Sequence, residues 1–251
     1  MCLVVLGIDA HPDYPLILAA NRDEFHARPT QEARWWADKP DILGGRDLQA
    51  GGTWLALRRS GRFATVTNFR DAQPPSPEHR SRGFLVTDFL EDDAAPQDYV
   101  GSIDEGNYAG FSLLVGDANR AAYLSNREDG DRTLEPGVYG LSNALLDGPW
   151  HKVETSKAKL SELIAADNVN ETSLMRLMAD RDRAPASAVE AGRLDFDTAH
   201  AITAPFIVLP DYGTRCTTIV LADKGGNWQF TERRFGPSGE VTGESRLSFD
   251  A

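Results

Sequence analysis

The chain has 251 residues, of which 41% are hydrophobic and 25% charged, and these values are typical of an ordinary soluble globular protein. No apolar run approaches the ~20 residues that a membrane-spanning helix needs, so a transmembrane protein is excluded. Asp and Glu number 38 against 26 Lys and Arg, and the resulting net charge of -12 argues against nucleic acid as a partner.

The beginning of the chain is a poor match to a secretion signal. It has no basic leader, and Asp9, His11 and Asp13 interrupt its apolar stretch. We therefore expect a cytoplasmic protein. Two cysteines, Cys2 and Cys216, are too few for a disulfide framework and would stay reduced in that compartment.

The first third of the chain carries only strand patterns. Apolar runs predict strands at residues 3–8, 16–23, 42–45, 53–58 and 62–68, the last two joined by a Ser60-Gly61 turn. Ser81 is then expected to cap a helix over residues 82–92, in which Leu85 and Phe89 are spaced for one face. A second short helix is expected after Pro96.

Strand patterns return at residues 111–115, 121–125 and 137–141. Helical spacing predicts one helix from Pro149 to Asp167 and another capped by Asn170, and strands at 206–209, 214–222 and 228–235 close the chain. Because these elements are grouped and do not alternate as βαβ units, we expect an α+β architecture of antiparallel sheets with helices on their outer faces. The lack of a linker or repeat predicts one domain over residues 1–251.

Cys2 is the first candidate for chemistry. Initiator methionine is commonly removed before a small residue, and loss of Met1 would leave Cys2 with its thiol and its α-amino group on one carbon. An α-amine titrates at about 7.7 to 8.0 and a thiol at about 8.5, so the neutral amine can act as general base for the thiol. The alternative is a small buried hydrophobe that opens a strand.

The apolar run that begins at Leu16 continues into four polar residues, Asn21-Arg22-Asp23-Glu24. Strand alternation puts Asn21 and Asp23 on one face and Arg22 and Glu24 on the other, so at most half of this tetrad faces a given pocket. A solvated turn with local ion pairs is the alternative.

Three further residues stand at the ends of strand-like segments. Asn68 and Asn143 each end one, where an amide can donate to an oxyanion or bond its own turn. Arg215 begins another, and a partly buried guanidinium there needs an anionic partner, either a structural ion pair or a ligand. The five histidines show no metal-binding spacing, so neither a zinc site nor a resident cofactor is expected.

Several blocks in order resemble the NRDE family, also called the transport and Golgi organisation protein 2 family. They are Cys2, the tetrad at Asn21, Ser81-Arg82-Gly83, and longer blocks beginning at Gly110, Gly140 and Gly213. The match spans nearly the whole chain. That family is similar to the N-terminal-nucleophile hydrolases, so the resemblance implies a four-layer αββα sandwich with the nucleophile at the end of the first strand.

Within that superfamily the chain looks most like the cysteine amidases that cleave conjugated bile acids and penicillin V. The likeness implies that Cys2 attacks an amide or related acyl bond of a small acylated molecule. It also implies that Asp23 orients the Cys2 amino group and that Asn143 and Asn68 stabilise the oxyanion. Arg215 and Asp23 would set the pKa of the thiol and the orientation of the amine.

The tetrad leaves the individual roles open, because its spacing differs from the Arg and Asp of those amidases. Arg22 and Asp23 can exchange roles or share them with Glu24, and Asn21 belongs to the same catalytic candidate group. Members of the family are also tied to haem mobilisation and to lipid and secretory-pathway homeostasis. The resemblance therefore implies an alternative, a non-catalytic haem or lipid handling protein, in which a histidine or Cys2 would ligate haem iron.

Overall fold

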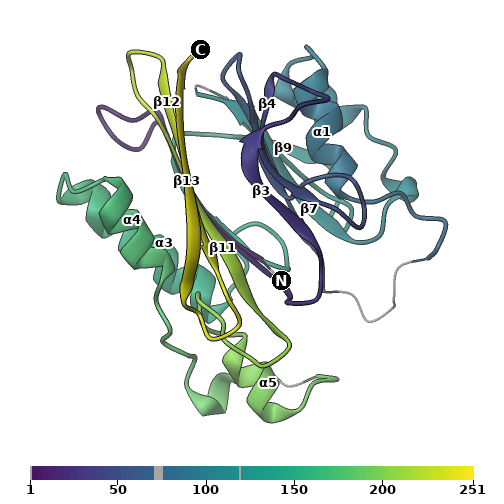
Figure 1. Cartoon of the computed structure of the whole chain (residues 1–251), viewed down its shortest axis with the longest axis vertical. Coiled ribbons are helices and arrows are strands. Elements are labelled where there is room, and N and C mark those ends of the chain that lie inside the picture. The colour runs from purple at the N-terminus through teal and green to yellow at the C-terminus, as the bar shows by residue number, and fades with distance from the viewer. Residues whose placement is uncertain (1, 71–75, 119, 191) are drawn as a thin grey trace.

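Two antiparallel β-sheets pack face to face in the computed structural model, and helices cover the outer face of each sheet (Figure 1). The structure describes residues 2–70, 76–118, 120–190 and 192–251. The α+β, four-layer αββα architecture predicted from the sequence is confirmed. Among the described residues, none of the helices combines the length and the apolar character needed to cross a membrane.

The first sheet has six strands and carries both ends of the described chain. Their order is β10 (Gly137–Leu141), β1 (Cys2–Ile8), β2 (Leu16–Phe25), β11 (Tyr212–Ala222), β12 (Asn227–Phe235) and β13 (Val241–Asp250). Helices α3 (His151–Ala165) and α4 (Glu171–Met178) lie on its outer face, and α5 (Phe196–Ala201) lies in the connection to β11 (Figure 1).

The second sheet has seven strands in the order of the sequence. They are β3 (Thr30–Trp35), β4 (Ile42–Asp47), β5 (Leu55–Arg58), β6 (Arg62–Asn68), β7 (Phe111–Asp117), β8 (Ala121–Ser125) and β9 (Asp131–Leu134). Helices α1 (Gly83–Glu91) and α2 (Pro96–Gly101) pack on its outer face through residues such as Leu85 and Phe89. Short 3-10 turns at Glu105–Asn107 and Ala186–Ala188 complete the described elements.

Strand alternation divides the apolar residues of β1 between two cores. Val4, Leu6 and Ile8 join the core between the two sheets, whereas Leu3 and Val5 pack under α3 and α4. Burial on both faces explains why β1 reads as a continuous apolar run. The strand is therefore fixed on both sides, and its first residue is held at a defined place at the edge of the inter-sheet core.

Two sequence-based predictions of local structure are wrong. Helix α1 begins at Gly83 with Arg82 at its N-cap and without a side-chain cap bond, so Ser81 does not cap it. Residues 206–209 form no strand, only an isolated bridge from Val208 to Gly213. Pro205 and Pro210 flank that segment, and prolines lack the N–H that extends a ladder.

The start of α1 packs directly on the loop before β5. A Cβ on Gly52 would lie 2.5 Å from the carbonyl carbon of Gly83, and one on Gly83 would lie 2.9 Å from the nitrogen of Thr53. Only glycines allow this approach, because both obstacles are backbone atoms that cannot move aside without shifting the helix. The two glycines thus bring Ser81 and Arg82 close to the inter-sheet region.

We expect Gly52→Ala to destabilise the protein by roughly 1–3 kcal/mol, because the added methyl group forces the start of α1 away from the sheet. Gly101→Ala is the matched control, since a Cβ there meets nothing within 4 Å. Urea denaturation followed by circular dichroism measures both. Equal midpoints for the two variants would contradict this account of the contact.

Candidate active site

Cys2 is the first residue of β1 and lines a cavity of about 130 Å³. The side chain is half-buried, and antiparallel pairing places it directly opposite Arg22 on β2. Trp54, Asn68 at the end of β6, and Ser81, Arg82 and Gly83 at the start of α1 form other parts of the wall. The cavity therefore lies at one end of the inter-sheet core, between the two sheets.

The backbone of Cys2 is fastened by the segment that follows β10. The Cys2 N–H donates to Asn143 Oδ1 at 3.2 Å, and Ser142 Oγ donates to the Cys2 carbonyl oxygen at 2.7 Å. Asn143 Nδ2 donates in turn to the Asn68 carbonyl oxygen at 2.6 Å. The structure thus brings Cys2, Asn143 and the backbone of Asn68 together, with Asn143 as the bridge between the two sheets.

The tetrad on β2 alternates between two environments. Asn21 faces the helical layer, where its Nδ2 donates to the carbonyl oxygens of Met178 at 2.8 Å and Pro205 at 2.9 Å. Its Oδ1 accepts from Thr217 Oγ1 at 2.6 Å. Asn21 is fully buried and does not line the cavity. Its hydrogen bonds connect β2 to α4 and to β11.

Asp23 shares the helical face with Asn21 and forms a buried ion pair. Its Oδ1 accepts from Thr214 Oγ1 at 2.7 Å, and its Oδ2 lies 3.7 Å from Lys152 Nζ. Neither side chain of the ion pair is exposed to solvent. Burial raises the pKa of Asp23 and lowers the pKa of Lys152, and the charge of each partner opposes the shift of the other.

Lys152 was missed by the sequence-based interpretation, which took the helix around it only as apolar packing. The signal was present, because Lys152, Ser156 and Leu160 follow at intervals of four along α3 and all three are buried. A lysine on the buried stripe of a helix requires a charged partner. Asp23 on the neighbouring strand supplies it.

Arg22 faces the opposite way, into the region between the sheets. Its guanidinium carbon lies 4.2 Å from the ring centroid of Trp54, and Nη1 donates to Thr30 Oγ1 at 3.0 Å. Both contacts are to residues of the second sheet or the loop leading into it. Arg22 and Asp23, whose roles the sequence left open, are thus separated by the sheet itself, with Arg22 on the same face as the Cys2 side chain.

Burial has the largest effect on the pKa of the Cys2 thiol. Burial raises its pKa above the usual value, while a hydrogen bond from the Asp23 backbone and the charge of Arg22 act in the opposite direction. Burial also raises the pKa of Cys216 well above the usual value. Because the thiolate is the reactive form, Cys2 needs a base in contact with it before it can act as a nucleophile.

Arg215 and Glu24 lie at the margin of the site. Arg215 occupies a β-bulge in β11 and donates to the carbonyl oxygens of Phe25 at 2.8 Å and Arg28 at 3.3 Å. The sequence suggested an anionic partner for Arg215, but its hydrogen bonds go to these backbone carbonyls. Arg215 does not line the cavity. Glu24 does line it, and its Oε2 lies 3.9 Å from Arg28 Nε.

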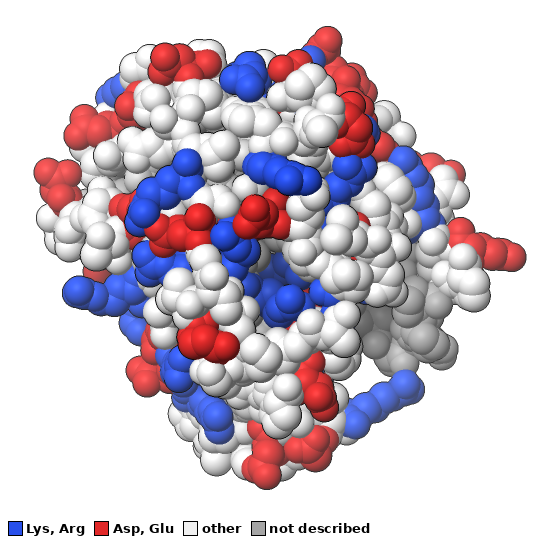
Figure 2. Space-filling view, viewed as in Figure 1, with Lys and Arg blue, Asp and Glu red and all other residues white. Residues whose placement is uncertain are grey.

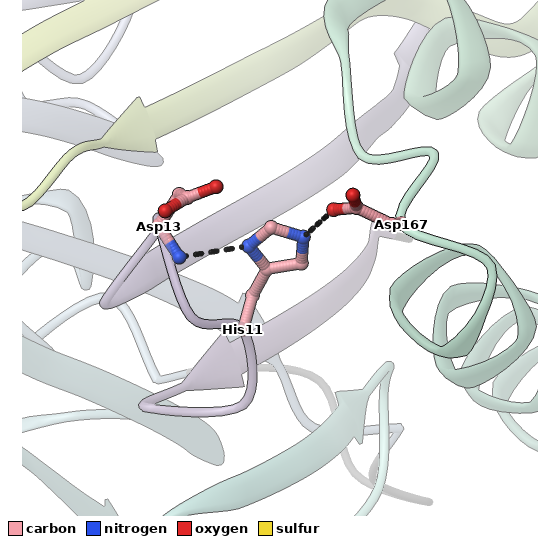
Figure 3. A group of neighbouring side chains, drawn as sticks. All are labelled: His11, Asp13 and Asp167. Carbon is pink, nitrogen blue, oxygen red and sulfur yellow. Dashed lines mark hydrogen bonds and ion pairs between the residues drawn. The ribbon is translucent and has the colours of Figure 1, made fainter.

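His11, Asp13 and Asp167 form a separate cluster at the far end of β1 (Figure 3). His11 Nδ1 accepts from the Asp13 backbone N–H at 3.1 Å, and Nε2 lies 3.1 Å from Asp167 Oδ1. Both ring nitrogens are therefore used by protein groups. These contacts connect the β1–β2 loop to the residues that follow α3.

Comparisons with known proteins agree with this description. The family model described as Transport and Golgi organisation 2 matches residues 1–237. The Transport and Golgi organization protein 2 homolog of Homo sapiens is 36% identical over 256 residues, which cover 93% of this chain and 92% of that protein. Transport and Golgi organization protein 2 of Drosophila melanogaster is 28% identical over 258 residues, with coverages of 92% and 91%.

Two solved structures with a similar fold carry the names of hydrolases. The Caenorhabditis elegans ortholog of N-acylethanolamine-hydrolyzing acid amidase has a TM-score of 0.51 at 11% identity and is covered over 92% of its chain, against 88% of this chain. The C2A mutant of conjugated bile acid hydrolase from Clostridium perfringens has a TM-score of 0.55 at 9% identity, with coverages of 98% of this chain and 92% of that chain. The predicted N-terminal-nucleophile hydrolase fold is confirmed.

We expect Lys152→Met and Asp23→Asn each to cost about 3–5 kcal/mol of stability, because either change leaves one buried partner without its neighbour. The double variant should lose clearly less than the sum of the two. Urea denaturation of all four proteins at pH 7 gives the coupling free energy.

Lys159→Met on the same helix is the control for this cycle. Lys159 pairs with Asp180, but its side chain is 42% exposed, so its loss should cost no more than about 1 kcal/mol. Strictly additive losses for Lys152 and Asp23 would show that the two groups do not interact.

Proposed function

The chain belongs to the Transport and Golgi organisation 2 family, and we propose that it is a cysteine hydrolase of the N-terminal-nucleophile type. Its substrate would be a non-peptide amide or related acyl compound of small size, handled in the cytoplasm. The observation that carries the proposal is the position of Cys2. Its thiol stands at the beginning of the first strand, on the wall of a cavity, and the Cys2 backbone is fixed by Asn143 and Ser142.

The catalytic step requires removal of Met1. The α-amino group of Cys2 then takes the thiol proton, and Sγ forms a bond to the acyl carbon while the carbonyl oxygen becomes an oxyanion. The amine passes the proton to the leaving group as the acyl–nitrogen bond breaks. Water then cleaves the thioester, releasing a carboxylic acid and restoring the thiol. Burial raises the pKa of the Cys2 thiol, so a base must remove its proton. In this mechanism the base is the α-amino group of the same residue.

Asn143 and Asn68 are the proposed oxyanion donors. The proposal is supported by position: Asn143 Oδ1 accepts from the Cys2 nitrogen, so the amide lies beside the nucleophile, and Asn68 lines the cavity. Asn143 Nδ2 gives one N–H to the Asn68 carbonyl oxygen, and its second N–H is the proposed donor. Loss of one such donor costs roughly 3 kcal/mol of transition-state stabilisation in other hydrolases. Asp23, held by Lys152 behind the β1–β2 pair, is proposed to orient the freed amine. Arg215 would act only at a distance, since its guanidinium is committed to backbone carbonyls.

The cavity favours hydrolysis over haem or lipid handling. Its volume of about 130 Å³ is below the roughly 300–1,000 Å³ typical of sites for drug-sized ligands. Among the described lining residues, Cys2 alone belongs to the types that ligate haem iron, because the lining includes no histidine. A small acyl group fits this space better than a macrocycle. A Soret band on titration with haem would instead support the carrier.

We expect the purified protein to lack Met1 and to release nitrophenol from short-chain 4-nitrophenyl acyl esters. Cys2→Ala should abolish that turnover without changing the circular dichroism spectrum. Cys216→Ala is the matched control, because Cys216 is buried and should have no part in the reaction. Intact mass spectrometry reports the amino terminus, and a protein that retains Met1 would overturn the amine-assisted mechanism.

Asn143→Ala should lower kcat by about 100-fold or more, while the midpoint of urea denaturation falls only modestly. The reason is that the amide contacts the reacting residue, whereas only a few backbone bonds depend on it. Steady-state kinetics and denaturation on the same preparation compare the two effects. A loss of activity no larger than the loss of folded protein would make Asn143 a structural residue.

A further inference from the structure

Arg22 is a buried cation whose charge is not matched by an ion pair. Only 4% of the residue is exposed, and within the described part of the chain its guanidinium makes one hydrogen bond, to Thr30 Oγ1, and lies over the face of Trp54. A guanidinium carries five N–H donors, and its burial is costly unless an anion accompanies it. Arg22 also lines the cavity, on the same strand face as the Cys2 thiol.

The acidic residues of the cavity lining make their ion pairs with Lys152 and with Arg28, which serves two of them. Asp23 pairs with Lys152 behind the sheet. Asp47 Oδ2 lies 2.7 Å from Arg28 Nη2, and Glu24 lies 3.9 Å from Arg28 Nε. None of the three forms an ion pair with Arg22, although all three residues line the same cavity.

Other groups near Arg22 add positive potential. Arg82 lines the same cavity from the start of α1, where the helix end carries partial positive charge. The charge of Arg22 reaches Arg215 as well, because it adds to the burial that lowers the pKa of Arg215. Figure 2 shows one face of the molecule with a hollow near the middle of the view, where Lys and Arg side chains gather together with several Asp and Glu side chains.

We propose that the cavity beside Cys2 binds an anionic oxygen group of the substrate, a carboxylate or a phosphate, and that Arg22 is the residue that recognises it. This inference rests on the proposed function, since it names the substrate class of the same site. Arginine is the residue suited to such groups, because its planar fork can donate two parallel hydrogen bonds to one anion.

The register also places Arg22 and the nucleophile side by side on neighbouring strands. Cys2 and Arg22 are directly opposed across an antiparallel pair, where Cα atoms are about 4.5–5.5 Å apart. Both residues line one small cavity, with a volume of about 130 Å³. We therefore expect a short acyl compound with an acidic group near its acyl carbon, such as a monoacyl derivative of a short dicarboxylic acid.

Alkylation of Cys2 tests this without requiring turnover. Iodoacetate and iodoacetamide are nearly the same size, and each forms a bond from sulfur to carbon with loss of iodide, but only iodoacetate is anionic. The ratio of their rates at Cys2 removes any effect of thiol pKa, because that pKa enters both rates equally. Peptide mass spectrometry separates Cys2 from Cys216, and the chain unfolded in urea gives the reference ratio.

We expect the folded protein to favour iodoacetate about tenfold or more over the unfolded reference, and Arg22→Gln to remove most of that preference. Arg22→Lys should keep part of it. Arg59→Gln is the matched control, because Arg59 also lies over a tryptophan, at 3.9 Å from the ring centroid of Trp35, but does not line the cavity. An unchanged ratio in Arg22→Gln would overturn the proposal, and if that variant does not fold, a native ratio equal to the unfolded reference would do the same.

Two further measurements identify the anion and separate this inference from the proposed function. Glutarate and inorganic phosphate are each tested for protection of Cys2 against iodoacetamide, and protection by either one shows which group fits, whereas protection by neither would contradict the proposal. Mono-4-nitrophenyl glutarate and 4-nitrophenyl valerate, with five-carbon acyl chains, are then compared as substrates. If the alkylation ratio depends on charge but neither ester is hydrolysed, the proposed hydrolase activity is contradicted and the anion site is supported.

Discussion

The antiparallel register between β1 and β2 is the constraint on which the site depends. It sets Cys2 opposite Arg22 and Leu3 opposite Asn21, and a shift of one residue would exchange the faces of the whole tetrad. Such a shift is blocked because β1 is buried on both sides, between the inter-sheet core and the helices α3 and α4. The hydrophobic cores therefore fix the chemistry, although they contain none of the reacting groups.

The two faces of β2 handle charge in opposite ways. On the helical face, the buried side chains of Asp23 and Lys152 neutralise each other. The Asn21 side-chain amide is hydrogen-bonded to two backbone carbonyl oxygens and to Thr217. On the face between the sheets, Arg22 is stabilised by an aromatic ring and one hydroxyl, which do not cancel its charge. The sheet thus separates a closed electrostatic pair from a cation that remains available to a ligand.

The sequence predicted the layers well and the sheet edges poorly. Strands at residues 30–35, 131–134 and 241–250 were not anticipated, and they are β3, β9 and β13, each at the edge of a sheet. Edge strands carry polar and charged residues that discourage further pairing, so β13 with Glu244 and Arg246 lacks the apolar run that reveals a central strand. The short helix α5 was missed as well.

The same contrast holds within the site. Cys2, Arg22, Asp23, Asn68 and Asn143 stand at predictable strand ends, and the structure gathers them around one end of the inter-sheet core. Alternation along β2 correctly predicted which face of the sheet each side chain of the tetrad points to. The partner of Asp23 did not follow, because Lys152 is more than a hundred residues away in sequence and meets it only through the packing of α3 on the first sheet.

Buried charge is costly, and the protein bears that cost twice within a few residues. Replacing such groups by apolar ones often stabilises a fold, so stability alone is a weak reason to keep them. For Asp23 and Lys152 the two desolvation penalties are offset by their attraction, which leaves a rigid, neutral support behind the nucleophile. For Arg22 no carboxylate of the described chain performs that task. In our proposal, an anionic group of the bound substrate supplies the attraction that offsets the burial of Arg22. The residue whose charge is least compensated within the protein is then the one that selects the substrate.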